Sequence, residues 1–166
     1  MKLEEMTIDE LIKSVCIASA NDAMYALSEL VATTNENFIK MMNEKVKELK
    51  LINTNFVNVT GFDDENHYTT AYDMACIALE LLKYKDIILP YTSTYDSYIR
   101  NDTNNPFWLV NTNKMVKYYQ GMDGLKTGYT SKAGFCLTST AKRNDVRLIS
   151  VIMKADSSAN RNAMTK

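Results

Sequence analysis

The chain has 166 residues, of which 46% are hydrophobic and 23% are charged, and its formal net charge is −1. This hydrophobic fraction suffices for a folded core and excludes a disordered chain, and the length predicts a single domain over 1–166. The near-neutral charge, with Lys and Arg spread along the chain, gives no indication of binding to nucleic acid or to an anionic membrane surface.

The first half of the chain, 1–90, is expected to be mainly helical. Thr7 and Glu10 match a capping box, and the apolar residues after them recur at helical spacing, which predicts a helix that ends near Ser19. The same periodicity predicts a second helix over 22–31.

The helical half is expected to contain two more helices separated by a loop. The capping pattern Thr33-x-x-Glu36 predicts the third, whose methionine-rich face we interpret as core packing. Residues 53–66 are rich in Asn, Asp and Gly and predict an irregular loop. A fourth helix is expected to begin at Thr70, and Pro90 is expected to end the region.

The second half, 91–166, changes to a pattern typical of strands. Its apolar runs are β-branched and aromatic, with turn residues between them. The expected strands are 91–98, the part of 121–130 after Asp123, 135–141 and 146–153, with a polar turn at 101–106 and a hairpin turn at 143–145. Helices followed by antiparallel strands predict an α+β fold.

Cysteine and histidine usage predicts neither a metal site nor a cofactor. Cys16, Cys76 and Cys136 are far apart and form no CxxC, so buried free thiols are favoured over a disulfide framework or a zinc site. His67 is the only histidine, and we interpret it as a hydrogen-bonded loop residue rather than a catalytic one. The acidic run 63–65 is interpreted as solvated loop, with opportunistic cation binding as the alternative.

The tripeptide Lys126-Thr127-Gly128 lies in a segment expected to be extended. On a strand, Lys126 and Gly128 face one side and Thr127 the other. A strand that borders a cleft can offer an ammonium, a hydroxyl and a backbone edge, and glycine leaves room for a substrate against the backbone. The alternative is a surface turn without function, because the tripeptide is common by chance.

A second motif, Ser19-x-Asn21, lies between two predicted helices. A polar turn at this place could present a hydroxyl and a carboxamide to a cleft, or Asn21 or Asp22 could simply cap the second helix. Together with Lys-Thr-Gly and Ser-x-x-Lys, it belongs to the signature motifs of penicillin-recognising serine enzymes. The two motifs in this order are stronger evidence than either alone.

The third signature motif does not precede Ser19 in this sequence. Its one literal match begins at Ser139 and ends at Lys142, in a predicted strand where residues three apart point to opposite faces, so we expect it to be non-catalytic. A second Ser-x-Asn begins at Ser158 and is expected to cap a final helix.

Three segments, 19–23, 61–75 and 121–130, resemble the low-molecular-mass serine-type D-alanyl-D-alanine carboxypeptidases, and the sporulation-associated branch in particular. The resemblance continues through 143–149. It implies a partial β-lactamase or penicillin-binding transpeptidase-like fold, with a helical cluster followed by antiparallel strands. It also implies hydrolysis of the terminal D-Ala–D-Ala bond of peptidoglycan stem peptides through a serine acyl-enzyme, without a metal or cofactor, and inhibition by β-lactams.

The resemblance also implies roles for the motif residues. Ser19 would relay protons, and Asn21 would hydrogen-bond the substrate backbone. Lys126 would bind the terminal carboxylate of the substrate, and Thr127 would add a hydroxyl bond. The backbone N–H of Tyr129, the residue after Gly128, would supply half of the oxyanion hole.

In the family, the Ser-x-x-Lys nucleophile lies several dozen residues before Ser-x-Asn. We therefore expect it to lie upstream of Met1 and this chain alone to be inactive. Family strands would cover the strand 146–153, so without them the uncovered apolar edge is expected to lead to self-association, strand swapping or marginal stability. The family location, outside the cell at the outer face of the cytoplasmic membrane, is expected for the full-length protein.

Two alternatives remain open from the sequence. One is a β-lactamase, which shares the motif set, although no deacylating glutamate loop is evident between Ser19 and Lys126. The other is a non-catalytic peptidoglycan-binding module that naturally lacks the nucleophile.

Overall fold

The structure is a computed structural model that describes residues 5–166, so residues 1–4 of the expected domain lie outside it. The helices are α1 (Ile8–Lys13), the π-helix η1 (Ser14–Ala18), α2 (Asn21–Ala32), α3 (Asn35–Glu48), α4 (Ala71–Leu81), the 3-10 helix η2 (Leu82–Tyr84), α5 (Lys85–Thr92), α6 (Met115–Tyr118) and α7 (Ser158–Thr165). The strands are β1 (Asp96–Ile99), β2 (Phe107–Val110), β3 (Met122–Thr130), β4 (Gly134–Arg143) and β5 (Val146–Ala155).

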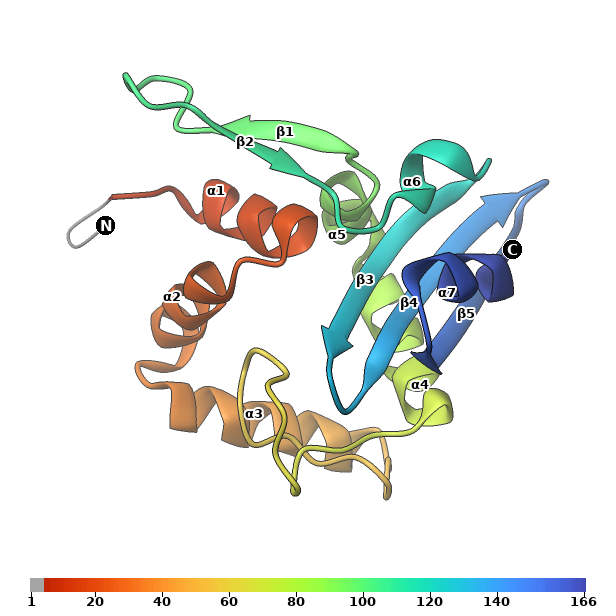
Figure 1. Ribbon diagram of the computed structural model, residues 1–166. Coiled ribbons are helices and arrows are strands. Elements are labelled where there is room, and N and C mark those ends of the chain that lie inside the picture. The colour runs from red at the N-terminus through yellow and green to blue at the C-terminus, as the bar shows by residue number, and fades with distance from the viewer. Residues whose placement is uncertain (1–4) are drawn as a thin grey trace.

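A three-stranded antiparallel sheet in the order β3-β4-β5 forms the centre of the fold. α7 packs over one face of this sheet and α4 lies behind it, while α1, α2 and α3 lie on the side of the sheet where β3 forms the edge (Figure 1). β1 and β2 form a separate antiparallel hairpin against α1 and η1. The expected α+β class, with helices first and antiparallel strands last, is confirmed.

The helix starts follow the predicted capping chemistry, with one shift. The Thr7–Glu10 capping box is present in both directions, and Thr70 caps α4. The predicted start of the third helix at Thr33 is wrong by one residue. Thr33 ends α2 with φ 69°, which leaves Thr34 extended so that its side chain accepts a bond from the Asn37 N–H. The methionine-rich face is only partly core, since Met41 is 47% exposed.

The predicted strand 91–98 is wrong at its start, because α5 continues to Thr92 and β1 begins at Asp96. The helix contains Pro90 instead of ending before it. A proline removes one backbone donor, but here the end of α5 is fixed by tertiary contacts. Thr92 is buried and its hydroxyl donates to the Asp123 carbonyl at 2.7 Å. The strand β2 and the short helix α6 were not predicted.

The predicted hairpin at 143–145 is confirmed. Asn144 and Asp145 both have positive φ, 47° and 62°, as a two-residue turn between twisted strands requires. Behind the turn, Arg147 of β5 makes two hydrogen bonds to the Asp123 carboxylate of β3, at 2.8 and 2.7 Å. It also donates to the Thr140 hydroxyl of β4, so one guanidinium ties all three strands together.

A small apolar cluster fixes the end of η1. Ile17 is fully buried against Ile99 of β1 and Leu109 of β2. Because Ser19 follows two residues later, this packing sets the position of its backbone.

β5 lies at the edge of the sheet and pairs only with β4 among the described strands. Val146 and Leu148 on this strand are 62% and 70% exposed. The expected apolar edge at 146–153 is therefore present, and self-association through it stays a prediction. Within residues 5–166, none of the helices has the length and apolar character needed to cross a membrane.

Candidate active site

Ser19 sits on a tight turn between η1 and α2. Its φ of 62° and ψ of 38° are left-handed, a conformation uncommon for a non-glycine residue. Its N–H donates to the Val15 carbonyl at 3.2 Å, and the side chain is exposed. The turn therefore presents the Ser19 hydroxyl to solvent rather than burying it against a helix.

The alternative in which Asn21 or Asp22 caps α2 is wrong. Ala20 occupies the N-cap position, and no side chain caps it. Asn21 is already the first helical residue, and the Asp22 carboxylate accepts from the next N–H, that of Ala23. Helix capping therefore does not account for the Ser19-x-Asn21 motif.

Lys126 of β3 reaches across to this turn. Its Nζ lies 2.6 Å from the Ser19 Oγ and also donates to the Thr127 carbonyl at 2.9 Å. Two motifs that are 107 positions apart in sequence thus meet through one hydrogen bond. Burial lowers the pKa of Lys126 to about 8, because the charged ammonium loses hydration, and the nearby Cys16 thiol opposes this with a smaller effect.

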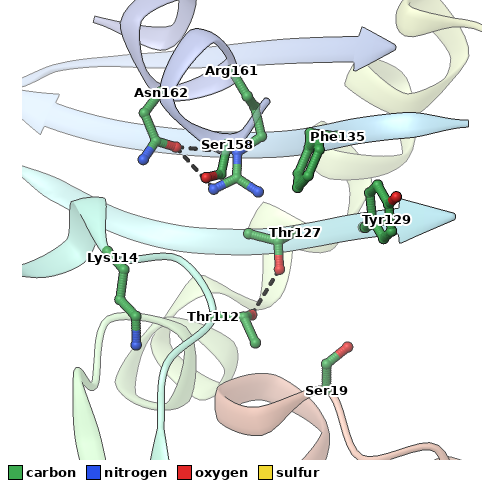
Figure 2. A pocket seen from close by; sticks show the side chains of 10 residues that line it. Ser19, Thr112, Lys114, Thr127, Tyr129, Phe135, Ser158, Arg161 and Asn162 are labelled. Carbon is green, nitrogen blue, oxygen red and sulfur yellow. Dashed lines mark hydrogen bonds between the residues drawn. The ribbon is translucent and has the colours of Figure 1, made fainter. Parts of the chain in front are cut away.

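Thr127 is held by a second contact between the sheet and η1. Its hydroxyl lies 2.7 Å from the Thr112 hydroxyl (Figure 2). The N–H of Thr112 donates to the Ile17 carbonyl at 3.0 Å. Thr112 therefore sets the distance between β3 and the turn that carries Ser19.

Two buried asparagines hold Thr112 in place. The Asn111 amide donates to the carbonyls of Thr92 and Thr94, and its side-chain oxygen accepts from the Asn113 N–H. Asn113 donates to the Gly124 carbonyl of β3 at 3.3 Å. Both asparagines are only 1% exposed. Sequence reasoning missed this segment, because an Asn-Thr-Asn run followed by a lysine resembles an ordinary polar loop.

These residues border a cavity of about 450 Å³ (Figure 2). It contains four of the six predicted site residues, Ser19, Thr127, Gly128 and Tyr129. Lys126 adjoins it through its bond to Ser19, whereas Asn21 is not among the lining residues. The remaining lining residues are Thr112, Lys114, Phe135, Ser158, Arg161 and Asn162.

Arg161 is a site residue that the sequence did not indicate. It extends from α7 toward Thr127 and is only 5% exposed (Figure 2). Its guanidinium donates to the Asn162 side-chain oxygen at 2.9 and 3.1 Å. Burial lowers the pKa of Arg161, and the residues that line the cavity include no carboxylate to offset its charge. The final helix was expected, but Ser157 rather than Ser158 caps it.

The literal Ser-x-x-Lys match is not a site. Ser139 is 2% exposed inside β4, and the Lys142 ammonium pairs with the Asp145 carboxylate at 2.9 Å. The expectation that these two side chains point apart agrees with this geometry. His67 accepts from the Val57 N–H at 3.2 Å and packs edge-on against Phe56, as expected for a loop residue.

The acidic run and the cysteines provide no further chemistry at this place. Asp63 accepts from the Thr130 hydroxyl at 2.7 Å and so ties its loop to the end of β3. Over residues 5–166, His, Cys, Asp and Glu side chains form no group of three that could hold a metal ion. Cys16, Cys76 and Cys136 are free, as expected, but they are half-buried rather than buried.

The family model for D-alanyl-D-alanine carboxypeptidases matches residues 1–157 of the chain. The chain belongs to the D-alanyl-D-alanine carboxypeptidase family. It is 51% identical over 160 residues to the carboxypeptidase DacF of Bacillus subtilis, which covers 96% of this chain and 41% of that protein. It is 35% identical over 158 residues to DacC of Escherichia coli, covering 92% of this chain and 37% of that protein. The chain thus spans about two fifths of the length of these curated relatives.

Solved structures of similar proteins share the fold. The carboxypeptidase DacD of Francisella tularensis matches with a TM-score of 0.88 at 26% identity, over 96% of this chain and 50% of that one. Penicillin-binding protein D2 of Listeria monocytogenes, in an ampicillin-bound form, matches with a TM-score of 0.84 at 30% identity, over 95% of this chain and 64% of that one. The expected penicillin-binding, β-lactamase-like fold class is therefore confirmed.

Proposed function

We propose that the full-length protein is a serine-type D-alanyl-D-alanine carboxypeptidase that hydrolyses the terminal D-Ala–D-Ala bond of peptidoglycan stem peptides. The observation that carries this proposal is the 2.6 Å contact between Lys126 of the Lys-Thr-Gly motif and Ser19 of the Ser-x-Asn motif. Family membership and the names of the relatives support the same reaction.

The charge of the cavity suits a substrate that ends in a carboxylate. Lys114 and Arg161 line it, and Lys126 adjoins it. We assign the substrate carboxylate to Lys126 and Arg161 together, because a guanidinium beside an ammonium can bind a carboxylate through two parallel hydrogen bonds. Thr127 adds a hydroxyl beside it, and the Tyr129 N–H is assigned to the oxyanion. The positive charges of Lys114, Lys126 and Arg161 also raise the local concentration of anionic substrate.

Ser19 lines the cavity on the side opposite the sheet, and Asn21 follows it at the start of α2. Ser19, bonded to Lys126, relays a proton to the leaving D-alanine, and Asn21 binds the substrate backbone. We assign the acyl-forming serine to a Ser-x-x-Lys segment outside the 166 residues, since none precedes Ser19 here. The chain alone is then expected to lack carboxypeptidase activity, because removing the nucleophile of a serine enzyme costs roughly 10⁶-fold in turnover.

We extend the proposal to inhibitors and location. The Listeria relative was solved with ampicillin and with cefotaxime bound, which supports β-lactams as inhibitors of the full-length protein. Its proposed location is outside the cell, at the outer face of the cytoplasmic membrane, where peptidoglycan stem peptides occur.

Intact-mass spectrometry after incubation with benzylpenicillin tests the proposal. The present chain is compared with a form extended upstream to include Ser-x-x-Lys. A stable penicilloyl adduct on the extended form alone, together with release of D-alanine from a D-Ala-D-Ala peptide, is the expected result. Rapid loss of the adduct with penicillin turnover would instead indicate a β-lactamase. An extended form that takes up no adduct would indicate a non-catalytic binding module.

Gly128 offers a prediction that separates binding from folding. The nearest atom to an added Cβ is the Cys136 Cβ at 3.9 Å, so alanine fits the fold. Gly128→Ala is expected to change the free energy of unfolding by less than about 1 kcal/mol. It should slow benzylpenicillin acylation of the extended form roughly 10²-fold, because the methyl group occupies the cleft beside the substrate backbone.

Gly124→Ala is the matched control for this prediction. Its Cβ would meet the Thr92 Oγ1 at 2.6 Å, so it should destabilise the fold by about 1–3 kcal/mol. Thermal unfolding and the acylation rate are measured on both variants. Equal effects of the two substitutions on acylation, once unfolding is accounted for, would contradict a substrate-contacting role for Gly128.

The edge of β5 is proposed to recruit the same strand of a second copy when the chain is studied alone. Val146 and Leu148 are exposed there, and an uncovered strand readily pairs with another chain. Light scattering is expected to show a mass that rises with concentration, and Leu148→Lys should restore a monomer. A monodisperse wild-type monomer at all concentrations would refute this pairing.

A further inference from the structure

We propose that Ser19 and Lys126 form a serine–lysine dyad in which Ser19 is itself an acyl acceptor, so that this chain hydrolyses activated acyl esters. This activity goes beyond the proposed carboxypeptidase reaction, in which Ser19 only relays protons. It needs no residue outside the 166, because nucleophile, base and cavity are all present.

The geometry of Ser19 is that of an exposed nucleophile. Its hydroxyl opens on the cavity of about 450 Å³, which has room for a small acyl group. Its left-handed backbone, φ 62°, is held by bonds from the Ser19 and Ala20 N–H groups to the carbonyls of Val15 and Ser14. The hydroxyl is therefore fixed in place before any substrate arrives.

Lys126 has the position and the surroundings of a general base. Its Nζ lies 2.6 Å from the Ser19 Oγ, within the distance at which a proton moves directly. Its pKa is lowered to about 8 by burial, so a substantial share of the side chain is neutral at mildly alkaline pH. An amine in this state takes up the proton of the serine.

Burial favours the neutral form of Lys126, and of the groups that face the lysine Cys16 raises its pKa but is outweighed by burial. Cys16 of η1 is the titratable neighbour, and its own pKa is raised by burial, so it remains largely a neutral thiol at pH 8. Lys114 and Arg161 line the adjoining cavity and are both cationic, whereas the lining residues include no carboxylate. The site thus holds no acidic partner that would return the lysine to its usual pKa.

The reaction balances with the ester and water alone. Neutral Nζ takes the proton from Oγ while Oγ forms a bond to the acyl carbon. The tetrahedral adduct collapses, and the bond to the leaving phenolate breaks with its electron pair. Nζ then loses its proton to solvent. In the second half, Nζ takes a proton from water as the hydroxide adds to the acyl carbon, and the departing Oγ recovers that proton.

The experiment uses the 166-residue chain with p-nitrophenyl acetate. A burst of p-nitrophenolate followed by slow turnover is expected, with a rate roughly 10²-fold above that of buffer, as for general-base activation. The acetyl group should map to Ser19 by peptide mass spectrometry. The burst rate should rise with pH through an inflection near 8, because only the neutral form of Lys126 acts as a base.

Ser19→Gly and Lys126→Arg are the decisive variants. Glycine adopts the left-handed turn without strain, so the first removes the hydroxyl and keeps the fold. Arginine stays charged at all accessible pH values, so the second keeps the cation and removes the base. Both should reduce the burst to background. Ser131→Ala and Lys132→Met, in the exposed turn between β3 and β4, are matched controls expected to change it less than twofold.

Several results would overturn the inference. They are a burst unchanged in Ser19→Gly, a stable acetyl amide on Lys126, a thioester on Cys16, or a rate no higher than buffer. None of these outcomes bears on whether an extended form releases D-alanine, because that reaction uses a different serine. Conversely, failure of the carboxypeptidase assay would leave the ester result standing.

Discussion

Full-length protein that carries Lys126→Met is expected to lose roughly 10²- to 10³-fold in kcat/KM for a D-Ala-D-Ala peptide. Methionine fills the same space but removes the ammonium that meets Ser19 at 2.6 Å and the charge that faces the substrate carboxylate. Steady-state release of D-alanine measures the loss. Lys132→Met, in the exposed β3–β4 turn, is the control and should leave kcat/KM within twofold.

The pH dependence of KM tests whether the charge of Lys126 binds the substrate carboxylate. The pKa of Lys126 is lowered to about 8, so the ammonium is present below pH 8 and is lost as the pH rises through that value. KM for the carboxylate-ended peptide should therefore increase above pH 8 in the wild type. In Lys126→Arg the charge persists, so KM should stay flat across this range even if kcat falls. A wild-type KM that is constant from pH 7 to 10 would contradict carboxylate binding by Lys126.

Loss of the Lys126 proton should weaken binding of the D-Ala-D-Ala peptide and speed up acyl transfer from the ester to Ser19. Peptide binding needs the protonated lysine, whereas acyl transfer to Ser19 needs the neutral one. The ester burst should therefore increase over the pH range in which peptide affinity declines. One group, measured by two assays, would then account for both profiles.

The sequence predicted the parts of the site that lie within short motifs. Ser19 and Lys126 could be named as candidates because each motif is compact and its chemistry is carried by adjacent residues, whereas their contact comes from the structure. Thr112 and Arg161 could not be predicted, because their roles depend on where β3 and α7 come to lie. No local pattern distinguishes the Thr112 that bonds Thr127 from a threonine in any loop.

For the fold as well, features set by neighbouring residues could be predicted, whereas those set by tertiary contacts could not. Capping at Thr7 and Thr70 and the turn at Asn144-Asp145 are local chemistry, and these predictions were correct. The error over 91–98 has a tertiary cause. Tyr91 and Thr92 have strand-forming side chains, but the bond from Thr92 to the Asp123 carbonyl holds them in a helix.

The stability prediction with the largest expected effect concerns Asn111. Asn111→Ala should lower the free energy of unfolding by about 3–5 kcal/mol, because it leaves the buried Thr92 carbonyl, the partly buried Thr94 carbonyl and the buried Asn113 N–H without their partner. A typical domain has only about 5–15 kcal/mol in total. Urea unfolding should show a lower midpoint with an unchanged slope.

Two further variants test the cause of that loss. Asn111→Asp keeps the shape but replaces the donating amide with an oxygen facing the carbonyls of Thr92 and Thr94, so it should cost at least as much as alanine. Asn37→Ala removes an exposed amide bonded to the Ala32 carbonyl and should cost less than about 1 kcal/mol. If Asn111→Asp were as stable as the wild type, packing rather than hydrogen bonding would hold this segment. Thr112, and with it the distance from Thr127 to the turn of Ser19, would then depend on side-chain volume alone.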